Sequence, residues 1–362
     1  MIHRTKTIAQ AEIEGGRQDY IDIAKGLGML SIIWGHICYA GISNKMIYAF
    51  HIPLFFFLSG LVFSPNKYAG FGMFIQKRVK GLIVPYCIYS FGTWMIWVIY
   101  SSTSHASIEN YWRPLLQTFL AQGSEGYLVH NVPLWFVMCL FAVEVIYYFI
   151  SKLPDAVIGI ISVLVAAIGV WTTYTDIVDF SKLPWSIDVA MMALPFYAAG
   201  SLLTKHFSHN EIVGQVKANK IVSCVVFSIS AVILYWGASY NGNVSMGRAD
   251  LGKSPYVFYG TAVFGVLGFM LLCIALSFTA SKIVSWFKWI GQNSFRVMAI
   301  HNPIKGIVIV VVATILHTTT SAVSTTIAYS GVAFCLTLLM TLAIVHVIEN
   351  SMKEIKRNLM MK

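Results

Sequence analysis

Residues 22–60 decide the fold, and they read DIAKGLGMLSIIWGHICYAGISNKMIYAFHIPLFFFLSG. The stretch holds two apolar segments of membrane-spanning length, joined by a short turn at residues 43–45. Four ionisable residues nevertheless lie within it: Asp22, Lys25, His36 and His51. Ionisable groups cost free energy at membrane depth, so they are rare there and mostly functional. The stretch therefore predicts a membrane protein that performs chemistry or moves a polar solute.

The composition of the whole chain supports a membrane protein. Hydrophobic residues make up 57% of the sequence and charged residues 11%, whereas soluble domains average roughly 25% charged residues. The six cysteines lie mostly inside apolar runs without a CxxC motif, so we interpret them as buried hydrophobic residues and expect no metal site. The net charge of +10 comes from lysines and arginines scattered among loops, which argues against nucleic-acid binding.

The hydropathy pattern predicts an all-α integral membrane protein with about ten transmembrane helices. We expect these helices near residues 22–43, 46–64, 82–101, 133–151, 156–174, 187–204, 219–239, 256–279, 294–316 and 327–348. Most loop lysines and arginines fall on one side if both termini are cytoplasmic, as the positive-inside rule requires. We therefore expect a cytoplasmic tail at 1–20, a membrane domain at 21–349 and a basic cytoplasmic tail at 350–362. The sequence shows no cleavable signal peptide and no internal repeat.

The ionisable residues of the first helix share one face. Lys25 and His36 are 11 residues apart, close to three full turns, so roughly 16 Å of helix separates them on the same side. Asp22 precedes Lys25 by three residues and lies on that face as well. Two interpretations of Asp22 and Lys25 remain open. They are either functional groups of the site or interfacial residues that extend their charged ends toward water.

The second helix brings another histidine to a similar depth. His51 lies about as far below the outer surface as His36 does, so the two imidazoles could meet in one cavity. Histidine suits general-base catalysis because it titrates near neutral pH. We therefore predict His36, His51, Lys25 and Asp22 as catalytic residues. The alternative is a histidine that only hydrogen-bonds between helices.

A basic run marks the cytoplasmic start of the third helix. Lys77, Arg78 and Lys80 lie within four residues and could bind the phosphates of a cytoplasmic cofactor. An anchor for anionic lipids is the alternative. We add Ser59, beside Gly60, to this predicted cofactor-binding set.

Four further polar residues lie in or near predicted membrane segments. Glu144 is an acid in the fourth helix, where it is either a partner for a cation or a protonated core residue. Arg296, His301 and Asn302 open the ninth helix, and the five-residue spacing places Arg296 and His301 on different faces.

The chain resembles the membrane acyltransferase 3 family, the integral membrane O-acyltransferases of bacterial surface glycans. The resemblance spans residues 17 to about 303. Its most specific part combines a basic residue, ten residues and then a histidine with the run FHIPLFFFLSG at residues 50–60. The other motifs are RQDYIDIAKG at 17–26, the basic run with Pro85-Tyr86, LWF at 134–136, and GQNS at 291–294 followed by His301-Asn302-Pro303. The DIAKG run is similar to the fucose 4-O-acetylase-like branch.

The resemblance implies a ten-helix fold that passes an acyl group, most simply acetyl, from cytoplasmic acetyl-CoA to an acceptor beyond the membrane. It implies that His36 is catalytic, that Lys25 occupies the family's basic position and that Lys77 and Arg78 meet the CoA phosphates. Family members often have Arg-x-x-Arg in that run, whereas this chain has Arg78-Val79-Lys80. It also implies a bacterial inner-membrane location, with no nucleic-acid partner.

The acceptor implied by the resemblance is a sugar or polysaccharide, in some cases lipid-linked. The outer loops at 102–132 and 239–255 carry aromatic and polar residues that suit a sugar surface, although membrane interfaces share this composition. A multi-span transporter, or a flippase for a polar solute or glycolipid, is the alternative function, because buried charges also form relays.

Overall fold

The computed structural model describes residues 17–103, 111–123, 127–175 and 183–360, and these ranges form helices and no β-strand. Each of the ten predicted spans corresponds to a long helix. These are α2 (Asp19–Ile37), α3 (Gly41–Leu61), α5 (Val84–Thr103), α7 (Trp135–Ile150), α8 (Asp155–Thr173), α9 (Ile187–His206), α11 (Lys220–Asn241), α12 (Pro255–Ser277), α14 (Ser294–Ile315) and α16 (Ile327–Met360). The all-α prediction is confirmed.

Shorter helical segments connect the long ones. They are η1 (Pro65–Lys67), α4 (Phe71–Arg78), η2 (Val79–Ile83), α6 (Arg113–Leu120), η3 (Val132–Leu134), η5 (Pro184–Ser186), α10 (His209–Ala218), η6 (Met246–Arg248), α13 (Lys282–Gln292) and α15 (Thr320–Thr325). The basic run spans the end of α4 and η2, where the helix widens to π geometry before α5 begins. The predicted C-terminal tail is helical, because α16 continues to Met360.

Eight helical segments of the described chain are long and apolar enough to cross a membrane, and α2 and α3 are not among them. Both have sufficient length, with 19 and 21 residues. They fall short in hydropathy because α2 carries two acids and a lysine, and α3 begins with a polar turn. The two helices that hold the predicted catalytic residues are thus the two of the ten whose apolar stretches fall short.

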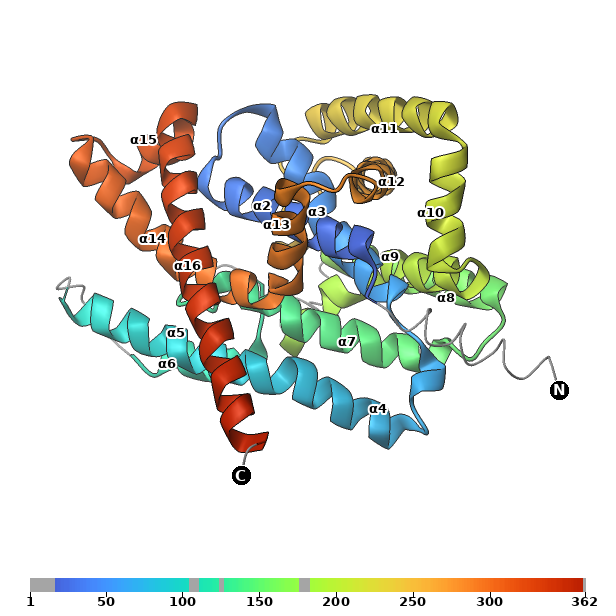
Figure 1. The fold of residues 1–362 in the computed structure, drawn as a ribbon, viewed down its shortest axis with the longest axis horizontal. Coiled ribbons are helices and arrows are strands. Elements are labelled where there is room, and N and C mark those ends of the chain that lie inside the picture. The colour runs from blue at the N-terminus through green and yellow to red at the C-terminus, as the bar shows by residue number, and fades with distance from the viewer. Residues whose placement is uncertain (1–16, 104–110, 124–126, 176–182, 361–362) are drawn as a thin grey trace.

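The α2–α3 hairpin lies in the middle of the molecule, with the other helices arranged around it (Figure 1). Extensive packing joins α3 to α9, α2 to α13, α11 to α12 and α14 to α16. In Figure 1, α4 and α10 lie toward one end of the molecule and α15 toward the other. The outer helices α8 and α11 bury only a minor part of their surface and leave apolar side chains exposed, as lipid contact requires.

Glycines allow α3 and α9 to cross at very short distance. A Cβ on Gly60 would lie 2.1 Å from the carbonyl oxygen of Tyr197, and a Cβ on Gly200 would lie 2.2 Å from that of Phe57. Any larger residue at either position would therefore push the helices apart. Such small-residue crossings are typical of membrane helix pairs, because backbone contact replaces the missing hydrophobic driving force.

Ion pairs join segments that the positive-inside rule places on the same side. Lys288 of α13 lies 3.0 Å from Asp19 at the start of α2. At the same predicted face, Lys205 at the end of α9 pairs with Asp155 at the start of α8. The contacts across the bundle are therefore compatible with the predicted topology.

We predict that Gly200→Ala destabilises the protein by about 1–3 kcal/mol, the usual cost of overpacking a tight contact. The measurement is the thermal unfolding midpoint of the detergent-purified protein. Gly260→Ala in α12 is the matched control, because nothing lies within 4 Å of its added Cβ. The control should leave the midpoint unchanged or raise it slightly, since alanine favours helix. Equal midpoints for both variants would contradict the tight crossing.

Candidate functional site

Three histidines from three helices gather at one place in the bundle. His36 ends α2, His51 lies in α3 and His301 lies in α14. The ring centroids of His36 and His301 are 5.5 Å apart. The ring of Tyr48 lies between His36 and His51. Its centroid is 6.2 Å from that of His36 and 5.0 Å from that of His51. The structure thus places the two predicted catalytic histidines around one tyrosine and adds His301 to them.

Backbone carbonyls orient two of these imidazoles. Nδ1 of His51 lies 2.8 Å from the carbonyl oxygen of Ile47. Nδ1 of His301 lies 2.9 Å from that of Met298 and 3.1 Å from that of Val297. Because a carbonyl only accepts, this geometry assigns the proton of the neutral ring to Nδ1 and leaves the Nε2 lone pair as the basic site. Nε2 of His301 is buried and has no hydrogen-bond partner in the described structure.

The chain turns at residues 38–40, between α2 and α3, whereas the turn predicted at residues 43–45 lies inside α3. The first turn of α3 fixes the position of His36. Asn44 of α3 donates hydrogen bonds to the carbonyl oxygens of Gly35 and Cys38, at 2.9 and 2.8 Å. These carbonyls belong to the end of α2, where helical partners run out. A Cβ on Gly35 would lie 3.1 Å from the Tyr48 ring, so the glycine lets that ring pack against α2. The hydroxyl of Tyr48 consequently reaches to 3.4 Å from Nδ1 of His36.

Two members of the site carried no role in the sequence-based prediction. Tyr48 precedes His51 by three residues, and Lys305 follows His301 by four. Both spacings place the pair on one helix face, so helical periodicity contains the signal. In the structure Lys305 lies within electrostatic range of His36 and of His301. We name the group of Tyr48, Lys305 and the three histidines the histidine cluster.

A large cavity opens at the other end of α2. Its volume is about 1380 Å³, and its wall comes from the start of α2, residues 61–70, the ends of α7 and α9 and the start of α10. Five lysine and arginine residues line it: Arg17, Lys25, Lys67, Lys152 and Lys205. Asp22 is the one acid in its described lining. The cavity is therefore cationic, and Lys25 contributes to it from the same helix that carries His36.

Asp22 is an anchor for the surrounding segments. Its carboxylate lies 2.6 Å from Nε of Arg17 and accepts a 3.1 Å hydrogen bond from the amide of Gln292 in α13. The side chain is almost fully buried. The Lys25 ammonium, by contrast, forms no ion pair or hydrogen bond with any residue of the described chain. Asp22 thus holds α2 against α13, while Lys25 is available to a molecule in the cavity.

The basic run lies beside the cavity without forming its wall. Nε of Arg78 lies 3.0 Å from the Glu144 carboxylate, and its Nη2 donates a 2.8 Å hydrogen bond to the Tyr68 hydroxyl. Of the two alternatives for Glu144, the structure favours the partner of a cation. Burial raises the pKa of Tyr68, an effect that nearby Arg78 opposes. Lys77 and Lys80 are exposed.

Ser59 and Asn302 make few contacts outside their own helices. The Ser59 hydroxyl donates a 2.8 Å hydrogen bond to the carbonyl of Phe55 within α3. Asn302 is half-buried next to His301, and its side chain forms no hydrogen bond among the described residues. The structure brings neither residue into the histidine cluster or the cavity wall.

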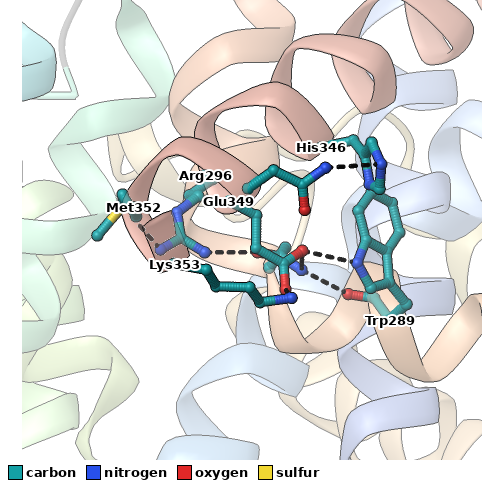
Figure 2. Close-up of polar contacts among 8 residues, drawn as sticks. Trp289, Arg296, His346, Glu349, Met352 and Lys353 are labelled. Carbon is teal, nitrogen blue, oxygen red and sulfur yellow. Dashed lines mark hydrogen bonds and ion pairs between the residues drawn. The ribbon is translucent and has the colours of Figure 1, made fainter. Parts of the chain in front are cut away.

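Arg296 belongs to a separate polar corner where α13, α14 and α16 meet. Figure 2 shows the Glu349 carboxylate between Trp289 and Lys353. It accepts a 2.8 Å hydrogen bond from the Trp289 indole, lies 2.7 Å from Lys353 and accepts a longer bond from the Asn293 amide. Arg296 donates to the oxygen of Asn293. The GQNS motif therefore ties three helices together in this structure.

The proline after His301 creates a second tie. Pro303 has no N–H, so the carbonyl of Ala299 loses the helical hydrogen bond that residue 303 would donate. Asn131, immediately before η3, donates a 2.7 Å hydrogen bond to this carbonyl and is fully buried. The segment that precedes α7 thereby fixes the backbone of α14 within one turn of His301.

No group of three His, Cys, Asp or Glu side chains within the described ranges could hold a metal ion. The chemistry that the cluster offers is proton transfer. Neutral Nε2 atoms accept protons, and the tyrosine hydroxyl and the lysine ammonium donate hydrogen bonds.

Comparison with known proteins shows the family to which the chain belongs. The model of the acyltransferase 3 family, described as an acyltransferase domain, matches residues 18–346. None of the curated proteins and none of the solved structures matches the chain. The family match covers the α2–α3 hairpin, the histidine cluster, seven of the eight apolar spans and the first part of the eighth. The chain therefore belongs to the acyltransferase 3 family and is a multi-pass membrane acyltransferase.

Proposed function

We propose that this protein transfers an acyl group, most simply acetyl, from cytoplasmic acyl-CoA to a hydroxyl of a sugar on the far side of the membrane. The acceptor is a surface polysaccharide or its lipid-linked precursor, and the membrane is the bacterial inner membrane. One observation carries the proposal: α2 joins the cationic cavity, through Lys25, to the histidine cluster, through His36.

The cavity suits the nucleotide end of CoA. Its volume exceeds the roughly 300–1,000 Å³ of ordinary small-molecule pockets. Lys25, Lys67 and Lys152 form no ion pairs with described residues, so their charges can meet phosphates. The basic run lies next to this wall, because Lys77 donates a hydrogen bond to the backbone carbonyl of Lys67.

The length of α2 suits the acyl-carrying arm. Roughly 16 Å of helix separates Lys25 from His36, comparable to a pantetheine arm. A thioester held by its nucleotide in the cavity would then have its carbonyl carbon near the imidazoles.

The reaction needs one base at the cluster. An imidazole Nε2, in our proposal that of His36, takes the proton of the acceptor hydroxyl while the oxygen attacks the thioester carbon. The carbonyl π electrons move to oxygen and form a tetrahedral anion. When this intermediate collapses, the C–S bond breaks and the CoA sulfur takes the proton from the imidazolium. The products are the sugar ester and free CoA.

The outer end of the cluster supports entry of a sugar. Tyr39, just beyond α2, is 56% exposed. Arg248 of η6 lies within electrostatic range of Tyr39 and of Tyr48. An exposed aromatic ring beside a cation and a hydroxyl is a surface that a polar, ring-shaped ligand can contact.

We predict that His36→Ala lowers acyl transfer at least about 100-fold, the usual contribution of a general base, while the protein still inserts in the membrane. The measurement is mass spectrometry of surface glycans and lipid-linked precursors from a deletion strain that carries each variant. His317→Asn is the matched control, because His317 is exposed and has a left-handed backbone that asparagine tolerates. Near-normal acylation with His36→Ala would remove this role.

A second prediction tests the cavity. Lys67→Gln and Lys152→Gln should each weaken binding of free CoA about two- to fivefold, because each removes one solvent-screened charge pair, and the double variant should weaken it more. The measurement is isothermal titration calorimetry of the purified protein at low and high salt. Because salt screens charges, the difference in CoA affinity between wild type and variants should be smaller at high salt.

Lys80→Gln and Lys217→Gln complete this experiment. Lys217 lies against the ring of Phe278, away from the cavity wall, and its substitution should change nothing. If Lys80→Gln weakens CoA binding and Lys152→Gln does not, the basic run binds the phosphates and the cavity does not.

A further inference from the structure

Lys305 is a lysine near the middle of a membrane-spanning helix. It lies in α14, which runs from Ser294 to Ile315, so roughly 15 Å of helix separates it from either end. A lysine side chain cannot cover that distance to reach the membrane interface. Such a position is costly unless the charge has a use.

The surroundings of Lys305 contain basic groups and no acid partner. Its neighbours in electrostatic range are His36 and His301. Within the described chain the ammonium forms no ion pair and no hydrogen bond. Asp22 and Glu144, the two acids that the sequence analysis placed in membrane segments, are paired elsewhere, with Arg17 and Arg78. A structural salt bridge therefore does not account for this lysine.

The position on the helix points Lys305 at the reacting groups. His301 and Lys305 are four residues apart and share one face of α14. His301 in turn lies against His36, with ring centroids 5.5 Å apart. The resting cluster thus holds a positive charge and three imidazoles, and it lacks a negative charge among its described members.

We propose that Lys305 is a catalytic residue that stabilises the oxyanion of acyl transfer, an inference that rests on the proposed function. When the acceptor oxygen bonds to the thioester carbon, the carbonyl oxygen gains the π electron pair and its negative charge. The Lys305 ammonium donates a hydrogen bond to this oxygen. Collapse of the intermediate returns the electron pair to the carbonyl and expels the CoA sulfur. A preorganised cation in a site shielded from water is an effective stabiliser of such an anion.

The test uses inside-out membrane vesicles from cells that express the full-length protein, so that native acceptors are present. Radiolabelled acetyl-CoA is varied in concentration, and label in glycan or glycolipid is measured. Lys305→Met should lower kcat about 100- to 1,000-fold and leave the KM for acetyl-CoA within twofold. Lys305→Arg should retain at least a tenth of the activity, because it keeps the charge. Lys45→Met at the start of α3 is the matched control and should behave as wild type.

A second readout separates charge from folding. Lys305→Ala should regain part of its activity when ethylammonium is added, whereas Lys45→Ala should not respond. Thermal midpoints of all variants check that they fold.

Three results would overturn the proposal: an unchanged kcat in Lys305→Met, an effect confined to KM, or equal losses in Lys305→Arg and Lys305→Met without rescue. Failure of the wild-type vesicles to transfer acetyl would instead overturn the proposed function, independently of Lys305.

Discussion

The cost of placing ionisable side chains at membrane depth is the constraint on which this structure depends. Three imidazoles and an ammonium group lie where the lipid would offer no hydrogen bonds. The protein offsets this cost locally for His51 and His301, because each ring donates Nδ1–H to a carbonyl of its own helix. Nε2 of His301 is buried and has no such partner in the described structure. A substrate bound in the cluster would supply the missing hydrogen bond to this atom.

Holding such groups in register requires rigid helix contacts. Asp22 binds segments on either side of it, and the crossing of α2 with α13 is so close that a Cβ on Gly291 would lie 1.8 Å from the Asp22 carbonyl oxygen. Asn44 closes the other end of α2. Both ends of the helix that links the cavity to the cluster are therefore tied to neighbours, which keeps the site's geometry on rigid elements.

The sequence predicted the helices and the meeting of two histidines, and it could not predict the full site. His36 and His51 lie in consecutive helices joined by a three-residue turn, so depth alone placed them together. His301 is more than 250 residues away in the chain. Helical periodicity shows which residues share a face, but not which distant helix that face meets, so neither His301's neighbours nor the role of Lys305 followed from spacing.

The basic run illustrates the same limit for charges. Three cations in four residues indicated a phosphate site, yet Arg78 pairs with Glu144, an acid from another helix. Pattern analysis counts charges without their partners, and burial of one ion pair changes what remains available. The cationic cavity takes its wall from five separate segments. No local motif could have predicted this cavity, because its charge is a property of the assembled helices.

The placement of charge along α2 explains how the proposed reaction could cross a membrane without moving an ion through it. The phosphates of CoA would stay at the cavity, where Lys25 and Lys152 lie. Only the neutral pantetheine arm and its thioester would enter the bundle, which avoids the large cost of burying an anion. Negative charge would then arise only in the tetrahedral intermediate, beside Lys305. A cation at membrane depth is costly in the resting protein, and that same cost favours the state in which an anion lies next to it.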